Sequence, residues 1–94
     1  MTTTVSALDA SMDGAWTVLT QEAAYLLDLD ARTGTRITHS AEAGEAEAFT
    51  IVRLDRCQIA APMVLALELQ APVSRRIKLI TTDVVSIRPM GVVE

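Results

Sequence analysis

Apolar and polar side chains alternate with a period of two along short segments of the chain, and this alternation is the feature that most limits its fold. In Met63–Gln70, for example, Met63 and three leucines fall on one side and the other four residues on the opposite side. A β-strand directs successive side chains to opposite faces, so this period is typical of a strand with one buried face. Turn residues separate the predicted strands, which are Ala15–Thr20, Ala24–Asp30, Thr35–His39, Phe49–Ile59, Met63–Gln70, Arg75–Thr82 and Val84–Arg88.

Strands without helical segments between them predict an all-β fold. We therefore expect about six to seven antiparallel strands closed into a small SH3-like barrel or a β-roll. The residues QEAAYLLDL (21–29) are also strong helix formers, so a helix is the alternative there. The next segment favours a strand, because Asp30 can begin a turn, Gly34 can supply a positive φ and a β-rich run resumes at Thr35.

Two details of the predicted strands stay open. The apolar side of Phe49–Ile59 switches near Arg53, which indicates either a β-bulge or a strand with both faces partly buried. Asp83 lies between the last two segments, where we expect a bend that separates two strands.

The length of 94 residues predicts one domain. Residues 14–94 hold the regular alternation and form the predicted domain. The preceding residues 1–13, MTTTVSALDASMD, are small and polar with no sustained period, so we expect a flexible tail and regular structure only after Gly14. Residues 40–48, SAEAGEAEA, predict a flexible acidic loop within the domain.

Composition excludes several classes of function and indicates a location. No segment approaches the roughly 18–20 apolar residues of a membrane helix, and the N-terminal residues lack the basic and apolar parts of a signal peptide, so we expect a cytoplasmic protein. The four glycines are too dispersed to form a phosphate-binding loop. Cys57 is the only cysteine, which excludes an internal disulfide, and its place in an alternating segment predicts a buried strand residue.

Residue types that could support catalysis are present but isolated. Asp28 and Asp30 could share a proton or a cation. The sequence favours the other interpretation, in which Asp30 begins the turn and Asp28 faces solvent opposite Arg36. His39 is the only histidine, and no local signature joins it to Cys57 as a nucleophile and base. The sequence therefore predicts a non-enzymatic protein without a cofactor or a bound metal.

Charge is distributed unevenly along the chain. Residues 1–48 hold two basic and eight acidic residues, whereas residues 49–94 hold six basic and four acidic residues. The basic residues of the second half could form one patch that meets nucleic-acid phosphates. This nucleic-acid hypothesis rests on Arg53, Arg56, Arg75, Arg76, Lys78 and Arg88. Its alternative is a solvated strand face whose charges prevent edge pairing.

Several strand patterns together resemble a group of small uncharacterised β-rich proteins of actinobacteria and their phages. The resemblance rests on Trp16-x-Val18-x-Thr20, Tyr25–Asp30, Thr35-Arg36, Pro62–Leu67 and Thr81–Ile87. It implies a β-rich architecture and a bacterial or phage setting, and it implies no activity and no site residues.

Elimination leaves a protein-interaction module as the leading hypothesis, with nucleic-acid binding as the alternative. The acidic residues Glu42, Glu45 and Glu47 could imitate phosphate or meet a basic protein surface, as in small phage-type or regulatory inhibitors of a host protein. A homodimer is a second way to complete a thin core. It would bury Val84, Val85, Ile87 and Val92.

Overall fold

The alternating segments of the sequence form strands in the structure. A computed structural model describes residues 6–9, 13–38, 46–69 and 74–89 of the chain. Within these ranges the chain is all-β, with seven strands and no helix, as the alternation predicts. The strands are β1 (Ala7–Leu8), β2 (Ala15–Thr20), β3 (Ala23–Asp28), β4 (Thr33–Thr38), β5 (Glu47–Gln58), β6 (Pro62–Leu69) and β7 (Arg75–Pro89).

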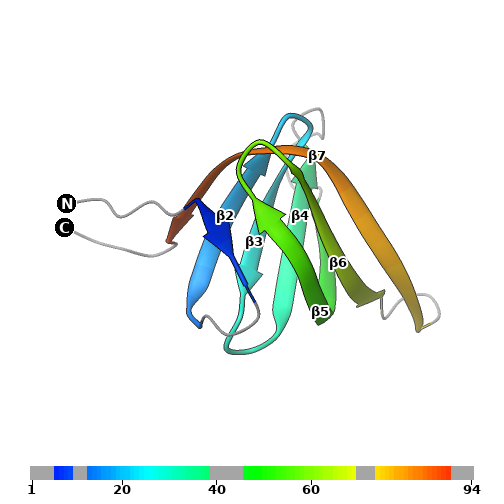
Figure 1. Ribbon diagram of the computed structural model, residues 1–94. Helices are drawn as coiled ribbons and strands as arrows, with labels where there is room; N and C mark the ends of the chain where they lie inside the picture. Colours follow the sequence, from blue (N-terminus) through cyan, green and yellow to red (C-terminus); the bar gives the residue numbers. More distant parts are fainter. Residues whose placement is uncertain (1–5, 10–12, 39–45, 70–73, 90–94) are drawn as a thin grey trace.

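The strands close into a barrel. Their order is β1-β5-β4-β3-β2-β7-β6, and β6 pairs in addition with β5, so β2 to β7 form a closed ring of six antiparallel strands in the described part of the chain (Figure 1). β1 is an extra strand that pairs with the end of β5. The prediction of a small antiparallel barrel is therefore confirmed.

β7 is one long strand that serves both halves of the ring. Residues 75–80 pair with β6, whereas residues 84–89 pair with β2. Figure 1 shows the strand arching over one end of the barrel between these two partners. The predicted separation into two strands at Asp83 is therefore wrong. At the arch the ladder is irregular between Pro62 and Val64, and the Met63 backbone N–H donates to Thr81 Oγ1 (3.0 Å) instead.

The core lies inside the ring and is mostly aliphatic. β6 shows the clearest pattern, because Met63, Leu65 and Leu67 are buried while the residues between them face outward. The described buried hydrophobic residues are Leu8, Val18, Ala23, Tyr25, Leu27, Leu29, Phe49, Ile51, Leu54, Cys57, Met63, Leu65, Leu67, Val84 and Ile87.

β5 departs from strict alternation, as the switch near Arg53 predicts. Its register against β6 shifts twice, between Ile51 and Arg53 and between Leu54 and Arg56. Ile51, Leu54 and Cys57 are buried at intervals of three residues, with two outward residues in each interval. The β-bulge alternative is therefore the correct one, and the strand has two irregularities rather than one.

The predicted hairpin of β3 and β4 is present, but its glycine has a different role. Arg32, and not Gly34, has the positive φ of 60°. The turn is also held by Asp28 Oδ1, which accepts hydrogen bonds from the backbone N–H groups of Asp30 and Ala31 (3.0 Å each). Gly34 is buried within β4, opposite Phe49 of β5. A Cβ there would overlap the Phe49 ring and lie 3.1 Å from Leu27 Cδ2, so the aromatic ring requires a glycine.

Regular structure begins before Gly14, contrary to the prediction that it begins only after this residue. Ala7 and Leu8 form β1 opposite Gln58 and Cys57, and the Ile59 backbone N–H donates to the Ser6 carbonyl (2.9 Å). A strand of two residues is too short to show a period of two, which explains why the sequence did not indicate it. The predicted acidic loop over residues 40–48 is also shorter, because Glu47 and Ala48 belong to β5 and residues 40–45 lie outside the described ranges.

We predict that Gly34→Ala destabilises the barrel by about 1–3 kcal/mol, because the added methyl group has to displace the Phe49 ring in a packed interior. Urea unfolding would measure this change. Thr33→Ala, on the neighbouring exposed residue, is the control and should change stability by less than about 0.5 kcal/mol. Combining Gly34→Ala with Phe49→Leu should cost less than the sum of the two single changes. Equal stability of Gly34→Ala and the wild type would contradict the close packing.

Candidate functional site

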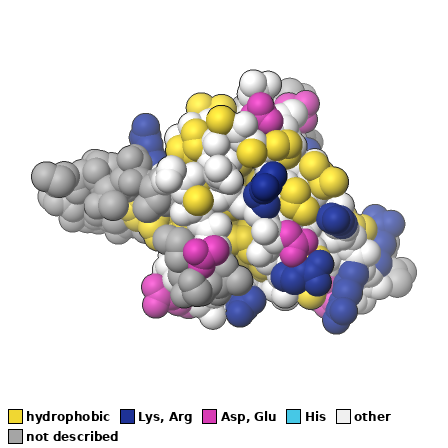
Figure 2. Space-filling view, viewed as in Figure 1, with side chains coloured by type: hydrophobic (Ala, Val, Ile, Leu, Met, Phe, Trp, Pro, Cys, Tyr) yellow, Lys and Arg dark blue, Asp and Glu magenta, His cyan; other side chains and the backbone are white. Residues whose placement is uncertain are grey.

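The outer face of β5, β6 and β7 gathers basic residues from three adjacent strands. The pairing places Arg53, Ala66 and Lys78 in one row across the sheet. Directly opposed residues project from the same face, so the two cations flank the small alanine. Figure 2 shows the dark blue side chains gathered over this part of the surface.

The next row on this face is partly apolar. It contains Arg56, Val64 and Ile80, which are also directly opposed. Ile80 is 61% exposed, a large value for an isoleucine in a strand. A third row, on the other side of the first, contains Glu68 and Arg76. We call the outer surface formed by these three rows, together with the exposed Asp55 that precedes Arg56, the basic face. Its charged and large apolar residues are Arg53, Asp55, Arg56, Val64, Glu68, Arg76, Lys78 and Ile80.

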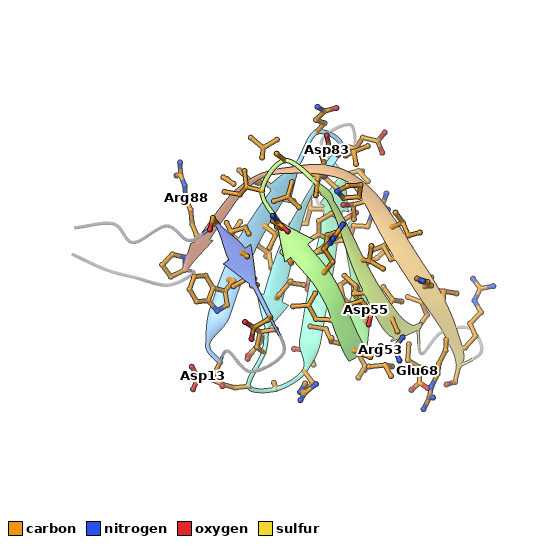
Figure 3. The ribbon with its side chains drawn as sticks, viewed as in Figure 1. Asp13, Arg53, Asp55, Glu68, Asp83 and Arg88 are labelled. Carbon is orange, nitrogen blue, oxygen red and sulfur yellow. The ribbon has the colours of Figure 1, made fainter. Side chains whose placement is uncertain are left out.

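Two of the four cations on the basic face are paired with carboxylates. Arg53 forms an ion pair with Asp55, and Arg76 Nε lies 3.5 Å from Glu68 Oε2. The hydrogen bond from Arg53 lowers the pKa of the Asp55 carboxyl, and the charge of Lys78 adds to this effect. Figure 3 shows Arg53, Asp55 and Glu68 close together at this end of the barrel. The face therefore carries a net positive charge together with internal ion pairs.

The structure brings together four of the six residues of the nucleic-acid hypothesis and separates two. Arg88 lies near the far end of β7, opposite Thr17 of β2, and Figure 3 shows it at the other end of the barrel from Arg53. Arg75 alternates with Arg76 and belongs to the opposite face of β7. The expectation of a single basic patch from all six residues is therefore wrong for these two.

The predicted acidic partner site is described at one position only. Glu42 and Glu45 lie outside the described residues. Glu47 belongs to β5, and its Oε1 accepts a hydrogen bond from Arg36 Nη1 (3.1 Å). Glu47 is thus engaged in an ion pair on a strand rather than free in a loop.

Arg36 links three strands, which sequence reasoning missed. Its Nε donates to Tyr25 Oη (3.2 Å) on β3, and its Nη1 reaches Glu47 on β5. The hydrogen bond to Tyr25 raises the pKa of the Arg36 guanidinium. The predicted pairing of Arg36 with Asp28 is wrong, because Arg36 lies opposite Tyr25 and Asp28 lies opposite Thr33. The sequence does place acidic residues just before the predicted strand that begins at Phe49. It cannot show that Glu47 lies opposite Arg36, because register depends on how two strands pair.

The residues considered for catalysis have structural roles where they are described. Asp28 holds the β3–β4 turn, and Asp30 Oδ1 accepts a hydrogen bond from the Gly14 backbone N–H (3.2 Å). His39 lies outside the described residues. Among the residues that the structure places, no group of three or more His, Cys, Asp and Glu side chains could hold a metal ion. In the same residues, no helix is long and apolar enough to span a membrane.

Cys57 is a core residue, as predicted. It is 2% exposed, and desolvation raises the pKa of its thiol to about 11, although a hydrogen bond with the Leu8 backbone opposes this shift. A thiol with a raised pKa is a poor nucleophile at neutral pH because little thiolate is present.

The proposed dimer contact is wrong for two of its four residues. Val84 and Ile87 point into the barrel and are buried in the core, so they cannot face a second copy. Val85 is exposed, and Val92 lies outside the described residues.

Comparison of the chain with protein-family models, curated proteins and solved structures found no match. The assignment of a function therefore depends on the geometry described above.

We predict that Leu8→Ala makes the Cys57 thiol react at least tenfold faster with a disulfide reagent at pH 8. Burial is what raises the pKa of the Cys57 thiol, and Leu8 is the buried residue opposite it, so we expect the Leu8 side chain to exclude water from the thiol. Loss of the leucine should admit water, lower the pKa and increase the thiolate fraction. The reaction of Cys57 with the disulfide reagent releases a coloured thiol from the reagent, and the increase in its absorbance gives the reaction rate.

Ala7→Ser, on the exposed neighbour of Leu8, is the matched control and should react like the wild type. The same rate in Leu8→Ala and the wild type would show that β1 does not cover Cys57.

Proposed function

We propose that the protein is a non-enzymatic interaction module that binds an acidic protein surface through the basic face. The observation that carries this proposal is the combination of cations and exposed apolar side chains in adjacent rows of one sheet face, above all Arg56 beside Val64 and Ile80. Interfaces between proteins are enriched in arginine and place apolar side chains at their centre. A complementary acidic surface would fix the orientation of the partner and accelerate association.

The composition of the basic face favours a protein over a nucleic acid. Half of its cations are already paired with carboxylates, which would also repel phosphate. None of the aromatic residues is placed to stack on a base there, since Tyr25 and Phe49 are buried and Trp16 lies on β2. Nucleic-acid binding stays the second candidate, because four cations on one face can contact a phosphate backbone without stacking.

The acidic partner site is the weaker form of the interaction hypothesis. Its one described member, Glu47, is held by Arg36 and would have to leave that ion pair to bind a partner. A regulatory or phage-type inhibitor of a host protein is consistent with the interaction module. That assignment rests on elimination and stays a prediction. The bacterial or phage setting, which the sequence resemblance implies, and the cytoplasmic location stay predictions too.

We predict that the double variant Arg56→Glu/Lys78→Glu loses at least nine-tenths of the partner captured from a lysate of the source organism after nuclease treatment. Neither cation forms an ion pair with another described residue, so the fold should tolerate the change, and the melting temperature should confirm it. The captured protein, identified by mass spectrometry and purified, should then bind the wild type directly in calorimetry.

Arg32→Glu/Arg88→Glu is the matched control, because it changes the total charge equally at exposed residues outside the basic face. Equal capture by both variants would contradict the proposal. Anisotropy with a labelled 20-base-pair duplex tests the second candidate. If four phosphates are contacted, affinity should fall roughly a hundredfold between 50 and 200 mM salt, and nuclease should abolish capture.

A further inference from the structure

The mouth of the barrel contains an apolar pocket that the proposed interaction does not use. Its volume is about 270 Å³, and its walls are aliphatic and aromatic side chains of β5, β6 and β7. These are Phe49, Leu67, Leu69, Ile77 and Leu79. The mouth of a β-barrel is a common place for a small-molecule site, and this volume fits a ligand of about ten non-hydrogen atoms. Ile77 is 39% exposed, so the wall is open to solvent.

One edge of the pocket is polar. Arg36 and Glu47 line it, and the hydrogen bond from Arg36 to Tyr25 fixes the guanidinium in place. A guanidinium has five N–H donors, and these two bonds use two of them. Arg36 therefore keeps donors for a ligand at the pocket edge, while the Glu47 side chain, 63% exposed, can move toward solvent.

A second cation lies next to the lining residues of the pocket. Arg75 is paired with Leu69 across the β6–β7 ladder and precedes Ile77 by two residues. Alternate residues of a strand share a face, so Arg75 is on the same face of β7 as the wall residues Ile77 and Leu79. It is exposed and forms no ion pair with another described residue. We define the rim as Arg36 and Glu47 of the lining together with Arg75, which is opposed to the lining residue Leu69; these three side chains carry a net charge of +1.

We propose that this pocket binds a small aliphatic carboxylate, with its hydrocarbon chain against the apolar wall and its carboxylate between Arg36 and Arg75. The apolar wall selects the chain, and the net charge of the rim selects an anion over a cation of the same length. A guanidinium can donate two parallel hydrogen bonds to the two oxygens of a carboxylate. A neutral alcohol has one oxygen and cannot accept this pair of bonds. This site is on the inner side of β7 and is independent of the basic face.

Calorimetric titration of the full chain with butanoate, hexanoate and octanoate tests the apolar wall. Each added methylene should increase affinity by about fourfold while the chain is still being buried. Octylammonium, with the same chain and opposite charge, should bind at least tenfold more weakly than octanoate. No saturable binding of octanoate, or equal binding of octanoate and octylammonium, would overturn the proposal.

Variants test the position of the carboxylate and of the chain. Arg75→Gln should weaken octanoate at least fivefold, whereas Arg88→Gln, at the other end of β7, should leave it unchanged. Ile77→Trp should abolish binding by filling the pocket, with the melting temperature as the check on folding. Because Arg75 is exposed, Arg75→Gln is expected to fold even if Ile77→Trp does not. Unchanged octanoate affinity in Arg75→Gln would overturn the assignment.

The outcome is separable from that of the proposed interaction. Arg75→Gln leaves Arg56 and Lys78 in place, so partner capture should persist in a variant that no longer binds octanoate. Conversely, Arg56→Glu/Lys78→Glu should retain octanoate binding, because both residues lie on the outer surface of the sheet.

Discussion

The pairing of β7 with two different strands is the constraint on which the rest of the structure depends. The first half of β7 completes the ladder with β6, and the second half completes the ladder with β2. Together with the β5–β6 pairing, this closes the ring and leaves β2 to β7 without a free edge along most of their length. Closure separates an inner surface, which is aliphatic, from an outer surface, which carries the charges. Both proposed binding regions depend on that separation, one on each side of β7.

The bulges of β5 explain why so much of the outer charge belongs to one strand. Regular alternation gives a strand one outward residue for each inward residue, as in β6. In β5 the buried positions recur every three residues, so each interval presents two outward residues. Arg53, Asp55 and Arg56 are among them. The same irregularity that maintains the core contacts of Ile51 and Leu54 therefore concentrates arginine on the basic face.

The sequence predicts the features that depend on alternation within one segment. It does not predict the contacts that depend on how strands pair with one another. The strands, the hairpin, the irregular β5 and the burial of Cys57 follow from patterns within short segments. Register between strands does not follow from such patterns. The sequence therefore predicts that Arg36 lies opposite Asp28, whereas in the structure it contacts Tyr25 and Glu47. Position 34 shows the same dependence on pairing. It requires a glycine because the Phe49 ring of the neighbouring strand occupies the space of a Cβ, and not because of the turn that precedes it. The pocket could not be predicted at all, since its walls come from β5, β6 and β7 and its polar edge includes a residue of a fourth strand, β4.

The double role of β7 also has a consequence for how the chain reaches its native state. Its second half pairs with β2, more than 60 residues earlier in the sequence. Such distant contacts carry a large loop-closure entropy, and barrels dominated by them typically fold in milliseconds to seconds rather than microseconds. Until that contact forms, the edges of β2 and β6 are available to other chains. Substitutions that weaken the β2–β7 ladder should therefore slow folding and promote aggregation even where the finished barrel tolerates them.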